Sequence, residues 1–150
     1  MVDIPISLDI STIDSFSLCL FKDTHHAKNA PHHYYIIIPT DTSYCFVICL
    51  ISSQIEKRVS YYTKNNQKCL QSLVMLDGSE LKFLTKPSVI DCNNAEYVHK
   101  RELLQRIAPG TYKKINENIP TELREKIIAA IDSSPKVKPF VKQSIKLNQE

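Results

Sequence analysis

Residues 32–51 read HHYYIIIPTDTSYCFVICLI, and the fold class follows from them. It holds two apolar runs rich in β-branched and aromatic residues, at 32–39 and 44–51, with the turn-forming sequence PTDTS between them. Such runs on either side of a turn predict a β-hairpin. Both faces of the second strand are apolar, so neither face can be left in water. A small closed or half-closed barrel, or a sheet covered by helices, meets this requirement.

Shorter apolar segments on both sides extend the predicted sheet. The segment FSLCLF at 16–21 precedes the hairpin and is joined to it by a polar stretch. Four further short strands are predicted after the hairpin, about ten residues apart, a spacing typical of a small all-β unit. They cover residues 70–76, 81–84, 88–92 and 95–98.

The chain changes character after residue 98. Residues 100–107 and 121–132 carry apolar side chains at helical spacing, and prolines at 120 and 135 flank the second segment. We therefore expect an α+β protein, mainly β, with two or three C-terminal helices. A single domain over 1–150 is predicted, with a β-barrel core at 15–98, a helical part at 99–134 and a basic surface tail at 135–150.

Composition excludes several classes of protein. With 150 residues, 43% of them hydrophobic and 23% charged, the chain is neither collagen-like nor fully disordered. Its two glycines cannot form a glycine-rich phosphate loop, and no cofactor is expected. The apolar runs are too short to cross a bilayer, and the early aspartates do not suit a signal peptide, so we expect a cytoplasmic protein with no membrane partner. The five cysteines lie mostly in apolar runs and are expected to be buried free thiols.

Charge is unevenly distributed along the chain. The net charge is +3, and residues 99–150 hold 11 basic and 6 acidic side chains. This C-terminal excess gives mild support to a polyanionic partner.

Four histidines form the densest polar cluster, and a metal-dependent hydrolase built on them is one alternative. The cluster consists of His25, His26, His32 and His33, with Cys19 upstream. The spacing C-x5-HH-x5-HH does not match that of zinc sites, so no metal is expected. His25 and His26 are otherwise residues of a solvated loop.

Two pairs of adjacent residues lie where the predicted strands begin and end. His32 and His33 point to opposite faces of their strand, so one of them faces a cleft, as a general acid or base or as a structural residue. Ser52 and Ser53 follow the second strand, where hydroxyls can hold a phosphate or merely form a loop. No GxSxG sequence surrounds these serines, so a serine hydrolase is not supported.

Lysines and tyrosines further along suggest a groove for nucleic acid. Lys82 and Lys86 lie around a turn between short strands, and Tyr61 and Tyr62 form an exposed aromatic pair in this interpretation. Charge that follows a phosphate backbone and rings that stack on bases are the chemistry of single-strand binding.

These segments resemble a known family. Residues 32–103 look like the small SH3-like barrels of the PemK and MazF toxin superfamily, the mRNA-cleaving endoribonucleases of bacterial toxin–antitoxin pairs. The similar pieces are Pro31 followed by HHYYIII, the sequence ICLISSQ at 48–54, and PSVIDCNNAEYVHKREL at 87–103. LDG at 76–78 and KPSV at 86–89 also resemble a subgroup of plasmid- and phage-linked proteins.

The resemblance implies an SH3-like barrel that cleaves single-stranded RNA without a metal, with an antitoxin as protein partner and a homodimer as assembly. In that family an arginine beside the strand-introducing proline acts on the scissile phosphate, together with a threonine or serine at the end of the next strand. Ser52 or Ser53 fits the second role. Asn29 and Ala30 stand where the arginine is expected, so His32 or His33 would replace it.

Two functional hypotheses follow. In the first, His32, His33, Ser52 and Ser53 are catalytic residues of an endoribonuclease, a hydrolase, and Lys82, Lys86, Tyr61 and Tyr62 bind RNA. In the second, the absent arginine marks a barrel that does not cut and serves as an interaction module for nucleic acid or protein.

Overall fold

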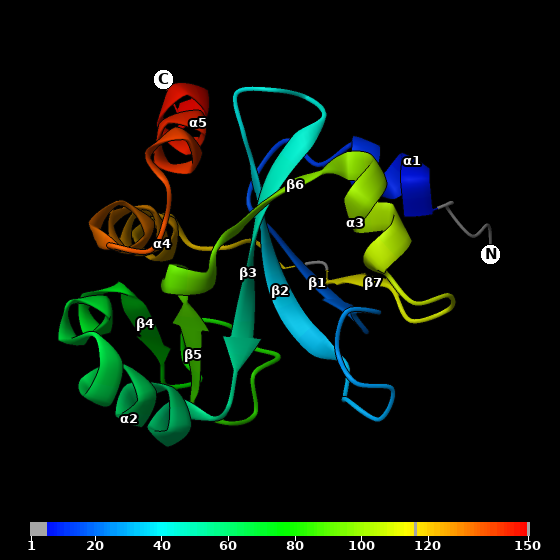
Figure 1. Ribbon diagram of the computed structural model, residues 1–150. Coiled ribbons are helices and arrows are strands. Elements are labelled where there is room, and N and C mark those ends of the chain that lie inside the picture. The colour runs from blue at the N-terminus through cyan, green and yellow to red at the C-terminus, as the bar shows by residue number, and fades with distance from the viewer. Residues whose placement is uncertain (1–5, 116, 150) are drawn as a thin grey trace.

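The computed structural model describes residues 6–115 and 117–149, leaving aside the side chains of Ser7 and Leu8, and it has an α+β architecture (Figure 1). The strands are β1 Ser17–Phe21, β2 His33–Pro39, β3 Cys45–Ser52, β4 Leu73–Leu76, β5 Ser88–Asp91, β6 Glu96–His99 and β7 Lys113–Ile115. The α-helices are α1 Ile6–Ser11, α2 Ile55–Asn65, α3 Lys100–Arg106, α4 Thr121–Ser133 and α5 Pro139–Gln149. Two 3-10 helices, η1 Gln67–Ser72 and η2 Cys92–Asn94, precede β4 and β6.

The predicted hairpin forms the centre of an antiparallel sheet. Its register runs from Tyr34 opposite Ile51 to Pro39 opposite Phe46. The strand order is β4-β5-β3-β2-β1-β7, and β6 pairs with the first half of β3 while β5 pairs with its last two residues. In the described part of the chain no ladder joins the end strands β4 and β7, so the sheet is open.

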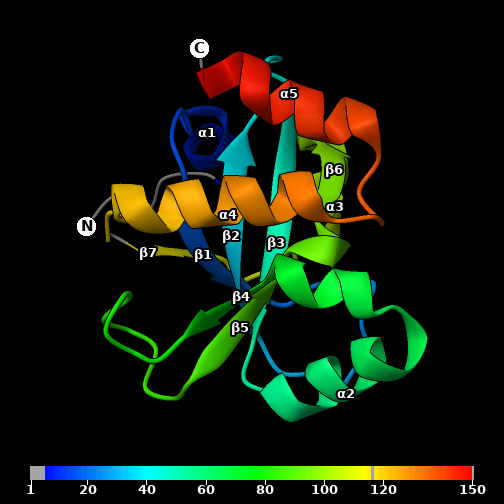
Figure 2. The same cartoon turned by 90° about the vertical axis from the view of Figure 1, so that its left-hand side faces the viewer.

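One face of the sheet is covered by the two C-terminal helices. Figure 2 shows α4 and α5 lying across β2 and β3. Alternate residues of the hairpin, such as Ile36 and Val47, form a buried cluster with Ile127 of α4 and with Val141 and Ile145 of α5. The strand pattern selects these residues because successive side chains point to opposite faces.

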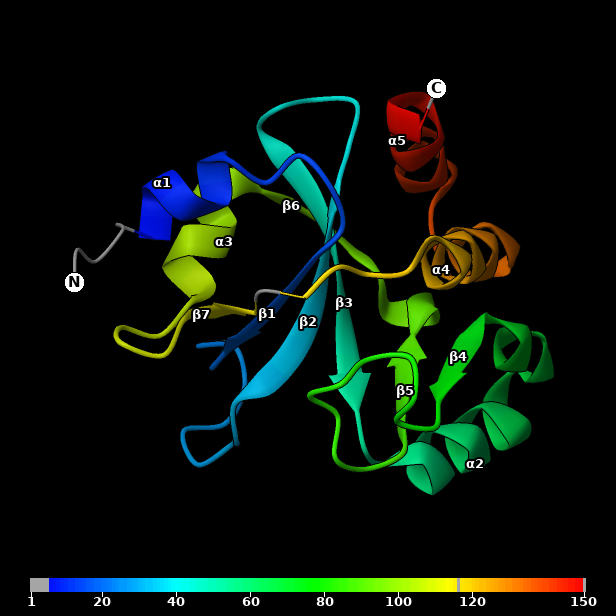
Figure 3. The same ribbon diagram turned by 180° about the vertical axis from the view of Figure 1, so that it is seen from behind.

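The other face of the sheet is covered by α1 and α3, as the view of the molecule from behind shows (Figure 3). Here Tyr35, Ile37 and Ile48 pack with Ile10 of α1 and Leu103 of α3. Both apolar faces of the hairpin are therefore removed from water by helices, which is one of the arrangements that the sequence predicts. The α+β class is confirmed, and α3 and α4 lie within one residue of their predicted ends.

The predicted strand at 81–84 is wrong. Leu81 and Leu84 are buried in the first cluster, but this segment is a turn in which the Leu84 N–H donates to the Leu81 carbonyl at 3.2 Å. The apolar side chains serve the core and do not mark a sheet pairing. The helix α2 was not predicted either. Its first residues lie near Lys86 and Pro87, which follow the 81–84 turn.

The predicted surface tail at 135–150 is also wrong. Residues 139–149 form α5, with Pro139 in its first position, and Val141 and Ile145 are buried against the sheet. Of its lysines, Lys146 is exposed, while Lys142 is half-buried and its Nζ donates to the Ser134 carbonyl at 2.8 Å. Four of the five free cysteines are buried, as predicted, and Cys45 is half-buried. No helix among the described residues has the length and apolar character needed to cross a membrane.

Candidate functional site

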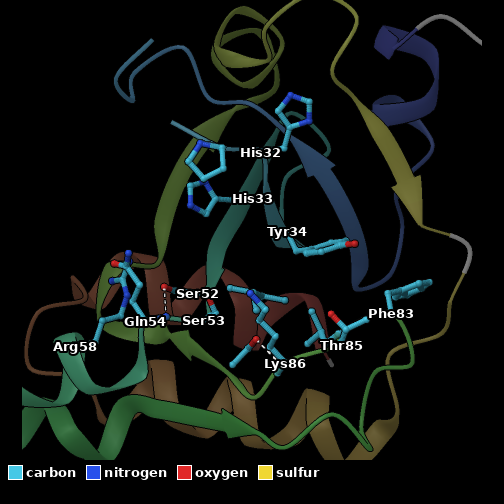
Figure 4. Close-up of a pocket in the computed structure, with 14 residues that line it drawn as sticks. His32, His33, Tyr34, Ser52, Ser53, Gln54, Arg58, Phe83, Thr85 and Lys86 are labelled. Carbon is cyan, nitrogen blue, oxygen red and sulfur yellow. Dashed lines mark hydrogen bonds between the residues drawn. The ribbon is translucent and has the colours of Figure 1, made fainter. Parts of the chain in front are cut away.

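A pocket of about 520 Å³ lies where β2 begins and β3 ends (Figure 4). The last pair of the hairpin register is Tyr34 opposite Ile51, and its continuation sets His33 opposite Ser52. The loop at 83–88 and the first turn of α2 complete the walls. The sequence-predicted residues His32, His33, Ser52, Ser53 and Lys86 line this pocket.

His33 is the histidine that faces the pocket interior. Its Nδ1 atom is buried without a hydrogen-bond partner among the described residues. The pKa of His33 lies below the usual 6.5, because burial disfavours the imidazolium and the nearby charges of His26 and Arg58 add to this effect. A neutral imidazole with an unpaired nitrogen can accept a proton near neutral pH.

His32 lies at the rim. Its side chain is exposed, and in Figure 4 its ring points away from Ser52. His32 precedes β2, whereas His33 is the first residue of that strand and is half-buried. Both histidines line the pocket, and His33 is the one that lies deeper, a choice that the sequence left open.

Ser52 and Ser53 differ in the same way. Ser52 is buried, and its Oγ accepts a hydrogen bond from the Gln54 N–H at 3.1 Å, which turns the chain from β3 into α2. The Ser52 hydroxyl proton remains available to a ligand in the pocket. Ser53 is exposed at the mouth.

Arg58 also lines the pocket, and the sequence did not point to it. It reaches the pocket from α2, and its Nη1 donates to Asp91 Oδ2 at 2.9 Å. Its Nε is buried without a partner in the described chain. Arg58 and Tyr62 are four residues apart, so they share one helix face, and both donate to Asp91. That spacing was the signal that could have revealed the helix and its arginine.

Asp91 is a positioning residue for Arg58. Its Oδ2 also accepts from Tyr62 at 2.8 Å and from the Asn94 side chain at 3.0 Å. Its Oδ1 accepts from the backbone and side-chain nitrogens of Asn93, both at 3.1 Å. The carboxylate is 1% exposed and cannot turn without breaking several hydrogen bonds. The guanidinium is therefore held at one edge of the pocket.

The aromatic wall of the pocket was not predicted. Tyr34 and Phe83 stack with ring centroids 6.4 Å apart and planes inclined by 21°. Figure 4 shows them across the pocket from Arg58, with the Lys86 side chain between. The wall offers a surface on which a planar group can lie.

Three of the predicted RNA-binding residues lie outside this pocket. Lys82 is exposed elsewhere on the loop, where its N–H donates to the Glu117 carboxylate at 2.7 Å. Tyr61 is exposed and lines a neighbouring hollow with Lys57 and Lys136. Tyr62 is 2% exposed, so the prediction of an exposed tyrosine pair is wrong. The Tyr62 hydroxyl donates to the buried Asp91 carboxylate, and this hydrogen bond keeps the side chain in the protein interior.

The remaining histidines do not join the pocket. His25 and His26 are exposed in the loop after β1, and His26 meets His33 edge to face with centroids 5.5 Å apart. Cys19 is buried on β1, where its thiol contacts the Tyr112 hydroxyl at 3.7 Å. Across residues 6–115 and 117–149, no three His, Cys, Asp or Glu side chains converge as metal ligands would.

Comparison with known proteins adds no assignment to this geometry. No protein-family model matches the chain, and no curated protein shows significant similarity to it.

Proposed function

We propose that the protein is a metal-independent endoribonuclease that cleaves single-stranded RNA in the pocket between β2, β3 and α2. One observation carries the proposal: a neutral imidazole, a buried serine hydroxyl and two cationic side chains line a single pocket. These groups are His33, Ser52, Arg58 and Lys86.

Cleavage by the RNA's own 2′-hydroxyl suits these groups. His33 takes the proton from the 2′-hydroxyl, whose oxygen then forms a bond to the adjacent phosphorus. The bond from phosphorus to the 5′ oxygen breaks, and that oxygen takes a proton from the Lys86 ammonium. Lys86 then regains a proton from solvent, and the His33 imidazolium releases its proton to solvent. The products are a 2′,3′-cyclic phosphate and a 5′-hydroxyl.

The negative charge that develops on the phosphorane needs fixed donors. Asp91 holds Arg58 through Nη1, which leaves the Nη2 N–H groups to donate to the phosphorane, and Ser52 can donate its hydroxyl proton. Donors held in place before the reaction stabilise such charge at no cost of reorganisation. The Tyr34 and Phe83 rings can stack on a neighbouring base, which favours a single strand over a duplex.

A non-catalytic RNA-binding module is the alternative, and the Arg58–Asp91 ion pair favours it. An arginine that already bonds to a carboxylate carries less net charge to a phosphate than a free one. Both readings place RNA in the same pocket, and they differ in whether the RNA is cut.

The test compares two neighbouring histidines. Wild type, His33→Asn and the matched control His32→Asn are incubated with an end-labelled single-stranded RNA in excess EDTA. We expect wild type and His32→Asn to release a cyclic-phosphate product, and His33→Asn to lose cleavage by about 10²-fold or more while still binding RNA. Intact RNA that is bound by wild type would establish the alternative module. Absence of both binding and cleavage would overturn the proposal.

A second pair of variants separates pocket charge from general charge. Lys86→Gln removes an ammonium from the pocket, and Lys82→Gln removes one from the same loop outside it. We expect only Lys86→Gln to impair cleavage strongly. Equal effects of the two changes would show that the loop acts through its overall charge.

A further inference from the structure

A second pocket of about 390 Å³ lies beside the first. Its floor is made by Tyr35 of β2 and by Ile48 and Leu50 of β3, and Ala95 and Arg58 form part of its rim. Arg58 lines both pockets, so the two hollows adjoin at its side chain. The volume falls within the range of small-molecule sites.

The two pockets follow one another along the same face of the hairpin. Tyr35 lies opposite Leu50 in the register, two residues along from the His33 and Ser52 positions. Two residues of a strand advance about 7 Å, and they place side chains on the same face. A ligand group bound over Tyr35 and Leu50 would thus lie about 7 Å from a phosphate bound beside His33.

Two polar atoms at this second pocket have no partner among the described residues. The Tyr35 hydroxyl is buried in a residue only 3% exposed, and the Arg58 Nε is buried as well. Tyr35 cannot turn its hydroxyl toward water, because its ring stacks on Phe21 with centroids 4.2 Å apart and planes inclined by 11°. Buried polar atoms normally have partners, so two unpaired ones at a hollow indicate a ligand that supplies them.

Three of the charged groups around the pocket are bonded to one another. Arg106 donates to both Asp23 and Glu96, which also line the hollow. Arg106 is therefore not free to bind a second phosphate. The hollow combines an apolar floor with polar groups at its edge, the unpaired atoms of Tyr35 and Arg58 among them, and this suits a planar group with apolar faces and polar edges.

We propose that this second pocket, defined by Tyr35, Leu50, Ala95 and Arg58, receives the base of the nucleotide whose phosphate lies beside His33. This inference rests on the proposed function. The Tyr35 hydroxyl and the Arg58 Nε both donate, so bases with exocyclic keto oxygens, uracil and guanine, bind in preference to adenine. The pocket thereby gives the protein a preference for the nucleotide at the cleavage position.

The probes are UMP, GMP, AMP and ribose 5-phosphate, which shares the phosphate and sugar but has no base. Each is titrated into the full chain while two sets of NMR signals are followed. The His33 imidazole reports on the first pocket, and the Leu50 and Ala95 amides report on the second. We expect all four compounds to shift His33. UMP and GMP should also shift Leu50 and Ala95 and bind about three- to tenfold more tightly than ribose 5-phosphate, as one or two added hydrogen bonds would give.

Tyr35→Phe tests the role of the hydroxyl directly. It removes a buried atom that has no partner, so the fold should keep its stability or gain some. We expect this variant to lose the advantage of UMP and GMP and to bind ribose 5-phosphate as wild type does. Tyr44→Phe, at an exposed tyrosine before β3, is the matched control. It should change neither the advantage of UMP and GMP nor the binding of ribose 5-phosphate.

The outcomes separate the two proposals. If ribose 5-phosphate shifts His33 but the bases add nothing, or if Tyr35→Phe keeps the preference, the base pocket is wrong and the proposed function stands. If AMP binds as tightly as UMP and GMP, the assignment to keto bases is overturned. If no compound shifts His33, the phosphate site fails and the base pocket fails with it.

Discussion

Two arginine–aspartate pairs, whose arginines both line the second pocket, use the same residue types in different ways. Arg106 is 5% exposed, and it joins Asp23, which is 0% exposed, at 2.5 Å. Arg58 is 24% exposed and joins Asp91 at 2.9 Å. All three nitrogens of the Arg106 guanidinium donate to a carboxylate. Arg58 instead keeps a buried Nε without a partner in the described chain.

The Arg106 pair stabilises the fold, whereas the Arg58 pair leaves a donor available to a ligand. Burial disfavours the charge of Arg106, yet the hydrogen bonds to Asp23 and Glu96 outweigh it and raise the pKa of Arg106. The same network lowers the pKa of Asp23 against the effect of burial. Arg106 ties the start of the β1–β2 loop to the end of α3, and none of its nitrogens lacks a partner. Arg58 can still donate.

The largest effect is expected from Arg106→Met. The substitution leaves Asp23 buried without its cation, and breaking a buried pair from one side costs about 3–5 kcal/mol of unfolding free energy. Urea denaturation measures the loss. The double variant Asp23→Asn with Arg106→Met removes the orphaned charge and should recover part of the stability. A loss below about 1 kcal/mol in the single variant would contradict the structural role of this pair.

These two pairs also explain what the sequence could predict. The hairpin was predictable because its turn and both apolar strands are contiguous. Arg106 and Asp23 are 83 residues apart, and Arg58 and Asp91 are 33 apart, so no local pattern joins them. His33 and Ser52 were found because both lie at ends of the predicted hairpin strands. Arg58 was missed because its helix begins directly after a strand, at an uncapped glutamine.

The second-largest effect is expected from Arg58→Gln, which should reduce RNA cleavage and binding much more than stability. Asp91 keeps its hydrogen bonds from Tyr62, Asn93 and Asn94, so the unfolding free energy should fall by only about 1–2 kcal/mol. Cleavage and affinity for single-stranded RNA should fall strongly. Arg106→Lys, which keeps the charge, should leave RNA binding near wild type. If Arg58→Gln costs as much stability as Arg106→Met, the contrast between the two arginines is wrong.

A smaller effect is expected on the titration of His33. Burial is the main reason for its low pKa, and the charge of Arg58 adds to it, so Arg58→Gln should move the pKa up toward 6.5. Arg106 is not among the groups that shift this pKa, so Arg106→Lys should leave it unchanged. NMR titration of the imidazole measures both. If Arg58→Gln leaves the His33 pKa unchanged, the guanidinium lies away from the pocket.

The same histidine links pH to stability and activity. Its pKa is lower in the folded chain than the usual 6.5, so the unfolded chain binds more protons between the two values. The stability contributed by neutral His33 is present above about pH 6.5 and is lost as pH falls through the folded pKa. Cleavage should fall over the same pH range as the pH is lowered, because His33, the general base, becomes protonated. His33→Asn should abolish both dependences, as denaturation and cleavage profiles between pH 5 and 8 would reveal.

The smallest effect is expected at the exposed pair that connects α4 and α5. Lys146 Nζ lies 2.7 Å from Asp132 Oδ1, but the two side chains are 50% and 46% exposed. Water competes for both charges, so Lys146→Ala should change the unfolding free energy by only about 0–0.5 kcal/mol. Ile145→Val, one residue earlier and 1% exposed, removes a single buried methylene and should cost about 0.5–1.5 kcal/mol. If the lysine change proved the larger, α5 would be held by charge rather than by the apolar face that packs on the sheet.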